Sequence, residues 1–163
     1  MGALEQLVHN KVLIAALTAW FFAQLIKTIV QSIIHKKLLL ERMWGAGGMP
    51  SAHSAMVCAL TVSTSRFYGV SSPIFALTLV LAFITVYDAM GVRRETGRHA
   101  KLLNRYLNEI EREKADIDGD GDPDVAVTTI DLKELIGHTP LEVLGGVILG
   151  IIVGLLFPIV PTI

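Results

Sequence analysis

Two histidines in this chain stand in motifs that could carry out acid–base or nucleophilic chemistry. The first pair to consider is His138 and Glu142, four residues apart in LIGHTPLEVLGG, so a helix through both would place the carboxylate beside the imidazole. Pro140 lies between them and suits the first residue of a helix, with His138 just before it. A histidine oriented by a carboxylate can be a nucleophile, a general base or a metal ligand. The alternative interpretation is a helix cap followed by a solvated glutamate.

The second histidine, His53, lies in GGMPSAHSA, which opens an apolar run. Pro50 is typical of the first turn of a helix, and the glycines before it permit a close backbone approach. Free N–H groups and the helix dipole make a helix start a binding site for anions. Ser51 and His53 would add side-chain donors to the same anion. The alternative is an ordinary helix cap.

Four charged residues near the apolar runs are further candidates for a phosphate site. Lys27 lies within one run, Asp88 ends another, and Arg93 and Arg94 follow shortly after it. Arginine binds phosphate through paired hydrogen bonds, although arginines after a membrane helix also anchor it at the interface. Asp88 would pair with Lys27 or with an arginine, which would offset the cost of burying the charge.

The elements that must position these residues are predicted to be membrane helices. The chain has 163 residues, of which 52% are hydrophobic and 18% charged, against about 25% charged in an average soluble domain. Residues 12–34, 71–92 and 139–163 carry one charge each, and about 20 apolar residues span a bilayer. A fourth run, 50–68, is shorter and would be partly shielded by protein. We expect a single integral membrane domain, residues 1–163, that is all-α with about four transmembrane helices. The alternative is a soluble bundle with very apolar core helices.

The distribution of basic residues predicts the orientation of these helices. If the four helices alternate, eleven of the fourteen Lys and Arg residues fall in segments 35–49 and 93–138, on one side of the membrane. The positive-inside rule makes that side cytoplasmic, so we expect a multi-pass protein of the inner membrane. The single cysteine, Cys58, excludes an intrachain disulfide. All the candidate residues above fall at the cytoplasmic face, and residues 93–138 form a cytoplasmic loop that contains an amphipathic helix.

An acidic stretch in this loop, DIDGDGDPD at residues 116–124, resembles the first half of a calcium-binding loop. Val127 stands where the bidentate glutamate of such a loop is expected. The candidate ligands of this structural calcium are Asp116, Asp118, Asp120, Asp122 and Asp124. The alternative is a solvated acidic turn.

Taken together, GGMPSAHSA, YDAMGVRRETGRHA and LIGHTPLEVLGG resemble the divergent branch of the type 2 phosphatidic acid phosphatase superfamily. That superfamily includes membrane lipid phosphatases and vanadium-dependent haloperoxidases. The resemblance implies a small membrane enzyme that hydrolyses a phosphomonoester or pyrophosphate of a lipid. The resemblance also implies that this enzyme requires no cofactor for catalysis. The partners would be a phospholipid or isoprenyl phosphate and the membrane itself, with no nucleic acid.

The resemblance also implies roles for individual residues. Ser51 would bind the phosphate, and His53 would protonate the leaving oxygen. His138 would attack phosphorus and form a phosphohistidine. Glu142 stands where the superfamily has an aspartate.

The sequence departs from the superfamily pattern at several positions. The first motif of the superfamily, a lysine seven residues before Arg-Pro, is absent. Lys27 is a loose substitute for its lysine. The third motif of the superfamily has an arginine six residues before its nucleophilic histidine. Six residues before His138 this chain has Leu132 instead. Arg93 and Arg94 would supply the missing positive charge.

Two other function classes remain open. One is a metal-dependent membrane phosphohydrolase with His53, Asp88, His138 and Glu142 as ligands. The other is a non-enzymatic protein that binds or transports phospholipids. A homodimer is also compatible with the sequence, because the glycines of LGGVILGIIVG offer faces for close helix packing.

Overall fold

The computed structural model describes residues 2–36, 48–117 and 138–159, without the side chains of residues 93–94 and 111–117. All the regular structure in these ranges is helical, which confirms the predicted class. The elements are α1 (Ala3–His9), α2 (Lys11–His35), α3 (Ala52–Tyr68), α4 (Pro73–Met90), α5 (Val92–Ile117) and α6 (Pro140–Leu156).

The four long helices of the bundle, α2, α3, α4 and α6, each begin at a polar cap that the sequence supplies. A side-chain oxygen at each cap accepts a hydrogen bond from a backbone N–H in the first turn, which satisfies a donor that the helix leaves unpaired. Proline follows the cap directly in α4 and α6, where its missing N–H costs nothing. The caps are Asn10, Ser51, Ser72 and Thr139.

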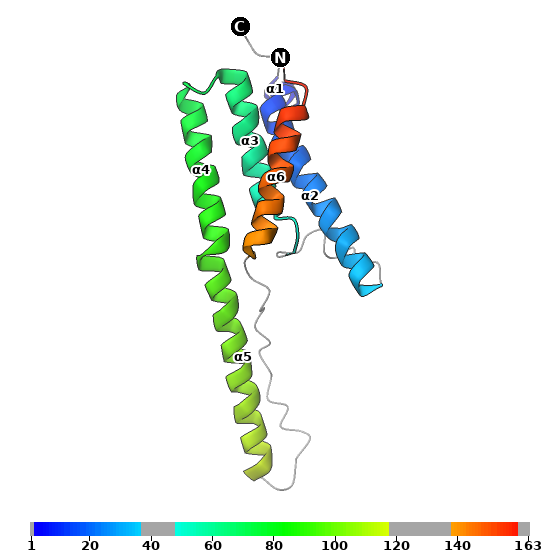
Figure 1. Ribbon diagram of the computed structural model, residues 1–163, viewed down its shortest axis with the longest axis vertical. Helices are drawn as coiled ribbons and strands as arrows, with labels where there is room; N and C mark the ends of the chain where they lie inside the picture. Colours follow the sequence, from blue (N-terminus) through cyan, green and yellow to red (C-terminus); the bar gives the residue numbers. More distant parts are fainter. Residues whose placement is uncertain (1, 37–47, 118–137, 160–163) are drawn as a thin grey trace.

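Helix α3 lies in the middle of the bundle and packs against α2, α4 and α6 (Figure 1). Helices α2 and α4 end, and α3 and α6 begin, at the same end of the bundle, which we call the site end. The start of α2 and the end of α6 lie at the opposite end. Helix α5 continues beyond the site end in the direction of α4 (Figure 1). The helices therefore alternate in direction, which is the condition under which the basic residues of segments 35–49 and 93–138 fall on one side.

The closest helix pair is α3 and α6, because a row of glycines removes the side chains between them. Gly146, Gly150 and Gly154 are buried at every fourth position of α6. A Cβ atom on Gly150 would collide with the carbonyl oxygen of Ala55 and would lie 2.8 Å from the Cβ of Cys58. These three glycines thus serve packing within one chain. A homodimer stays a prediction and would have to use another surface.

Arg66 joins the same two helices at the end opposite to the site end. Its guanidinium donates hydrogen bonds of 2.8 Å to the carbonyl oxygens of Gly154 and Phe157. These carbonyls lie in the last turn of α6 and at its C-cap, where no intrahelical donor is available. The positive charge also interacts favourably with the C-terminal end of the helix dipole.

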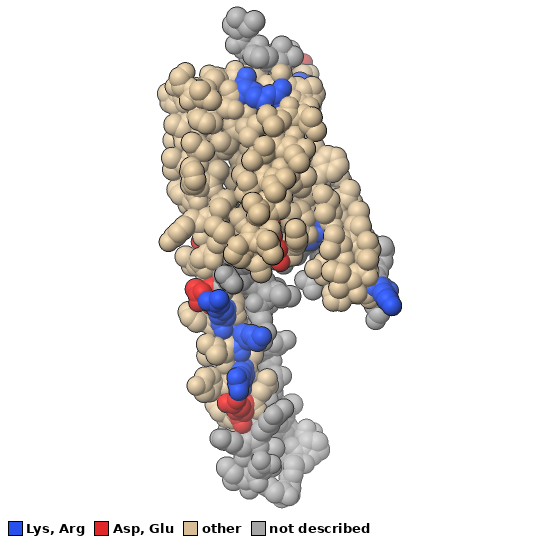
Figure 2. Space-filling model, viewed as in Figure 1, with Lys and Arg blue, Asp and Glu red and all other residues tan. Residues whose placement is uncertain are grey.

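The packing has the pattern of a membrane protein, with small residues inside and large apolar residues outside. The core cluster is made of alanines, namely Ala19, Ala23, Ala52, Ala55 and Ala59. Large side chains of α2, α4 and α6 such as Phe21, Leu77 and Ile152 are exposed. Without a hydrophobic driving force between helices in lipid, small residues at the interfaces are the expected arrangement. One face of the bundle shows a broad band without charged residues (Figure 2).

By length and composition, two segments can cross a membrane, α2 and Pro73–Ile110, while α6 is apolar but shorter. This supports a helical membrane protein and does not establish the expected count of four. Helix α3 is less apolar than the other helices of the bundle because it contains several hydroxyl side chains. Four of them are buried where α3 packs against its three neighbours, namely Ser54, Thr61, Ser63 and Thr64. A helix shielded in this way need not be apolar throughout.

Candidate functional site

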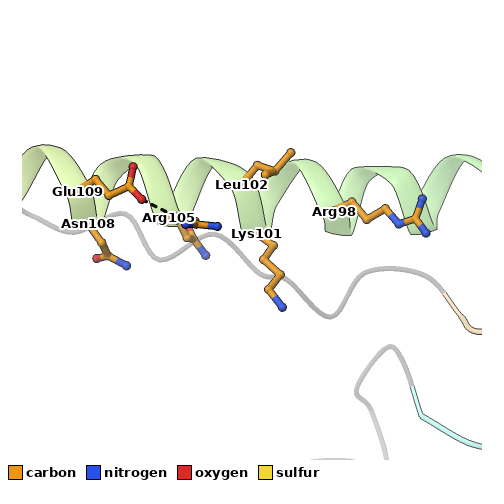
Figure 3. A pocket seen from close by; sticks show the side chains of 7 residues that line it. Arg98, Lys101, Leu102, Arg105, Asn108 and Glu109 are labelled. Atoms are coloured by element: carbon orange, nitrogen blue, oxygen red, sulfur yellow. Dashed lines mark hydrogen bonds and ion pairs between the residues drawn. The ribbon is translucent and has the colours of Figure 1, made fainter.

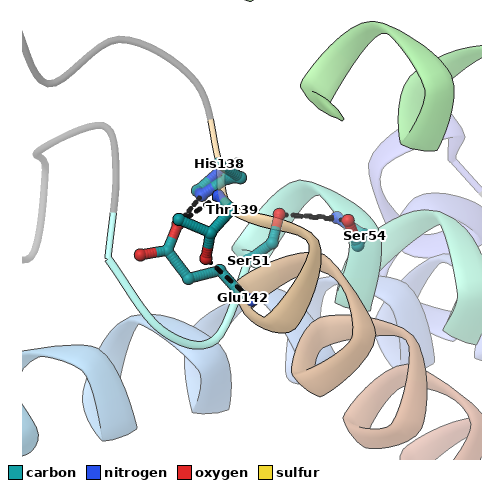
Figure 4. A network of polar contacts seen from close by, with 5 residues as sticks. All are labelled: Ser51, Ser54, His138, Thr139 and Glu142. Carbon is teal, nitrogen blue, oxygen red and sulfur yellow. Dashed lines mark hydrogen bonds and ion pairs between the residues drawn. The ribbon is translucent and has the colours of Figure 1, made fainter. Parts of the chain in front are cut away.

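His138 and Glu142 are joined at the start of α6 (Figure 4). Nδ1 of His138 lies 3.2 Å from Oε2 of Glu142, and His138 is only 6% exposed. The same Oε2 accepts the backbone N–H of Thr139 at 2.9 Å. In return, the hydroxyl of Thr139 accepts the N–H of Glu142 at 3.4 Å. The sequence left a helix cap and a histidine–carboxylate pair as alternatives, and in the structure one carboxylate forms both.

This contact has a consequence for the protonation of the imidazole. An ionised carboxylate only accepts hydrogen bonds, so Nδ1 of His138 must carry the proton in the contact with Glu142. Nε2 is then the nitrogen with the lone pair. The pair with Glu142 thus selects the tautomer in which Nε2 is the nitrogen for a role as nucleophile or general base.

The backbone around His138 links three helices at the site end. The N–H of His138 donates to the carbonyl of Ala89 in the last turn of α4 at 3.2 Å. The N–H of Ser51, at the start of α3, donates to the carbonyl of Glu142 at 2.8 Å. These two bonds fix the start of α6 against the end of α4 and the start of α3.

Of the two candidates in the Pro-Ser-Ala-His motif, His53 is exposed and Ser51 is fully buried. The ring centroids of His53 and His138 lie 6.4 Å apart at an interplanar angle of 56°. The hydroxyl of Ser51 accepts hydrogen bonds from the N–H of Ser54 at 3.4 Å and from its hydroxyl at 3.0 Å (Figure 4). Ser51 is therefore the cap of α3, and its contact with a phosphate stays a prediction.

Lys27 lies beneath the segment that leads into α3. It is 3% exposed on the inner face of α2. Gly48, at a φ of 88°, is so close that an added Cβ would lie 3.3 Å from Cγ of Lys27. Glycine suits this position for two reasons. L side chains rarely adopt such a φ, and any side chain here would press on Lys27. The structure thereby brings the predicted lysine of α2 close to Gly48, two residues before the Pro-Ser-Ala-His motif.

The remaining predicted residues are placed only in part. Asp88 is half-buried in the last turn of α4, next to Ala89. Arg93 and Arg94 lie in the first turn of α5, but their side chains are outside the described residues. The same holds for the side chain of Asp116, and the rest of the acidic stretch, Asp118, Asp120, Asp122 and Asp124, lies outside the described residues altogether.

The described residues also bear on the metal-dependent alternative. Nowhere in ranges 2–36, 48–110 and 138–159 do three His, Cys, Asp or Glu side chains come together in a way that could hold a metal ion. The four predicted ligands His53, Asp88, His138 and Glu142 therefore do not form such a cluster in this structure.

Two features of the site were not predicted. Thr139 is the hydroxyl half of a capping box with Glu142, and the Thr-x-x-Glu spacing before an apolar run is a signal that would have revealed it. The bond from His138 to the carbonyl of Ala89 has no sequence signal, because it joins backbone groups of segments far apart in the chain.

Comparisons with known proteins relate the chain to a family and to a membrane protein. Residues 8–153 match the model of a family described as the divergent PAP2 family. The chain is also similar to the uncharacterized membrane protein YuiD of Bacillus subtilis (strain 168). The two are 37% identical over 153 residues, which cover 92% of this chain and 95% of that protein. No solved structure matches the chain.

Proposed function

Because the chain belongs to the divergent PAP2 family, we propose that it is a membrane phosphatase that hydrolyses a phosphomonoester or pyrophosphate of a lipid. One observation carries this proposal. His138 is held by Glu142 in the tautomer of a nucleophile, and the exposed imidazole of His53 lies 6.4 Å from it, centroid to centroid. Two histidines with different environments suit the two roles that such a reaction needs, a nucleophile and an acid.

In the proposed reaction, Nε2 of His138 attacks phosphorus, and a P–N bond forms as the P–O bond to the leaving group breaks. His53, protonated before the attack, gives its proton to the leaving oxygen. Water then attacks the phosphohistidine, the P–N bond breaks, and the proton of that water returns to His53. Glu142 keeps Nδ1 of His138 protonated through both steps.

Positive charge near the phosphoryl group stabilises such a transition state. Lys27, Arg93 and Arg94 are the candidates for this charge at the site end. Since the hydroxyl of Ser51 is fully buried as the cap of α3, we assign the anion-binding role of its motif to the first turn of α3. The N–H groups and the helix dipole at this turn favour a phosphate.

We further propose that α2, α3, α4 and α6 all cross the inner membrane and that the site end faces the cytoplasm. The shielding of α3 by its neighbours and the apolar character of α6 support four spans. The excess of basic residues beyond the site end supports the orientation. A lipid phosphate would then reach His53 and His138 from the membrane, with its headgroup at the depth of the site.

The proposal is tested by phosphate release from detergent-purified protein. The substrates are phosphatidic acid, phosphatidylglycerol phosphate and an isoprenyl pyrophosphate, each with and without EDTA. We expect release that resists EDTA, is blocked by vanadate and is lost in His138→Ala. His9→Ala is the matched control, because His9 is an exposed histidine at the opposite end of the bundle.

Two other results would reject the proposal in favour of a named alternative. Release that EDTA abolishes would indicate the metal-dependent phosphohydrolase. Binding of these lipids without any release would indicate a phospholipid-binding or transport protein.

A further inference from the structure

Helix α5 has two chemically different faces. Its basic face carries Arg98, Lys101 and Arg105, which line a hollow of about 720 Å³ together with polar neighbours such as Asn108 (Figure 3). Arg98 and Arg105 pair with Glu95 at 2.6 Å and with Glu109 at 3.1 Å. Exposed pairs of this kind contribute little to stability.

The other face of α5 is apolar and exposed. Leu103 is 52% exposed, Tyr106 64% and Ile110 47%, and Val92 and Leu107 share the same side of the helix. The spacing 103, 106, 107 and 110 places these side chains on one broad stripe. Among the described residues, no helix packs over this stripe. Large apolar side chains in such a row are unfavourable in water, so the stripe needs a partner.

The place of α5 in the chain indicates what that partner is. Gly91 alone separates α4 from α5, and its backbone, with φ −96° and ψ −97°, is not helical. The chain therefore leaves an apolar, lipid-exposed helix and enters an amphipathic one within a single residue. The first turns of α5 are tethered at the membrane surface, which raises the effective concentration of the lipid around them.

We propose that α5 is an interfacial helix that lies on the anionic surface of the bilayer that α4 crosses. Leu103, Tyr106 and Ile110 insert at the boundary of the acyl chains, and the basic side chains extend to the lipid phosphates. In the structure α5 continues along α4 (Figure 1), so this arrangement requires a bend at Gly91. The breadth of the apolar stripe favours a lipid surface over a second copy, because a two-stranded coiled coil uses a narrower seam.

Spin labels on the full-length protein in vesicles test this inference. In a Cys58→Ala background, single cysteines replace Leu103, Leu107 or Ile110 on the apolar face, and Lys101 or Asn108 on the polar face. All five side chains are exposed, so the labels should not disturb the fold. The readout is the accessibility of each label to oxygen, which partitions into lipid, and to a water-soluble nickel complex. The vesicles contain either phosphatidylcholine alone or phosphatidylcholine with phosphatidylglycerol.

In the anionic vesicles we expect the ratio of oxygen to nickel accessibility to be several-fold higher at 103, 107 and 110 than at 101 and 108. High salt should reduce the difference, because it screens the attraction to anionic lipid. High nickel accessibility at all five positions would overturn the inference. So would protection of the apolar face with short distances between labels on two molecules, which would identify a second copy as the partner.

Discussion

At the residue scale, the carboxylate of Glu142 connects the fold to the proposed chemistry. It closes the capping box of α6 with Thr139 and holds the ring of His138. A substitution at Glu142 thus acts on both stability and activity. The two effects can be separated, because a capping box accepts glutamine as well as glutamate.

We predict that Glu142→Gln leaves stability almost unchanged and reduces lipid phosphatase activity about 10-fold, because a hydrogen bond to a charged group is worth roughly 1–2 kcal/mol more than a neutral one. In the place of Oε2, the amide oxygen can still accept from both the Thr139 N–H and Nδ1 of His138, so both contacts remain. What is lost is the negative charge, which stabilises the positive charge that the ring carries while the P–N bond exists. The measurement is kcat together with the thermal midpoint in detergent.

The matched control is Thr139→Ala, which removes the cap but keeps the carboxylate beside His138. It should lower stability by about 1 kcal/mol and cost less activity than Glu142→Gln. Wild-type activity in Glu142→Gln would contradict the proposed role of the carboxylate.

At the element scale, the bundle depends on the close approach of α3 and α6. The glycines of α6 face backbone oxygens of α3, which cannot move away as the end of a flexible side chain can. Arg66 fastens the far end of this pair, and the Ser51–Glu142 backbone bond fastens the site end. Because only the cap Thr139 separates His138 from α6, the spacing of α3 and α6 also controls the position of the candidate nucleophile.

We predict that Gly150→Ala destabilises the protein by about 1–3 kcal/mol, as overpacked interiors generally do, despite the higher helix propensity of alanine. The new Cβ would meet the Ala55 carbonyl and Cβ of Cys58. The measurement is the thermal midpoint in detergent.

Gly145→Ala, on the same helix, is the control for helix propensity. Its Cβ would approach only Met49 and Pro50, with the nearest atom, the terminal Cε of Met49, at 3.3 Å. It should leave the midpoint unchanged or raise it slightly. Equal effects of the two substitutions would show that the glycine row is not a tight interface.

At the scale of the whole molecule, charge and shape divide the protein into two ends. Arg66 lies at the end opposite to the site end, whereas the basic face of α5 lies beyond the site end (Figure 2). The band between them is apolar on its outer surface. This asymmetry is the basis for the proposed orientation, and it can be measured directly in cells.

We predict that, in a Cys58→Ala background, Ser71→Cys reacts with a membrane-impermeant maleimide in intact cells. Ser71 is exposed between α3 and α4, at the end proposed to face outward. Lys101→Cys on α5 should react only after the membrane is permeabilised. The reverse pattern would show that the site faces outward, and reaction of both in intact cells would exclude the proposed topology.

The sequence by itself determined the helices and most of the candidate residues. Apolar runs, helix caps and proline positions are local signals, so the all-α class and the starts of α2, α3, α4 and α6 could be predicted. The four-residue spacing of His138 and Glu142 indicated their contact, but His138 precedes the cap Thr139, so the capping box and not spacing within a helix brings the two side chains together.

Tertiary structure decided which of these residues are buried and which partners they contact. Only the packing of α6 on α3 shows that Ser51 is buried as a cap and that the glycines serve an internal interface rather than a dimer. Only the meeting of α4 with the start of α6 provides the Ala89 carbonyl that holds His138. These contacts join segments far apart in the chain, and their geometry depends on helix approach and burial, which spacing along one helix does not encode.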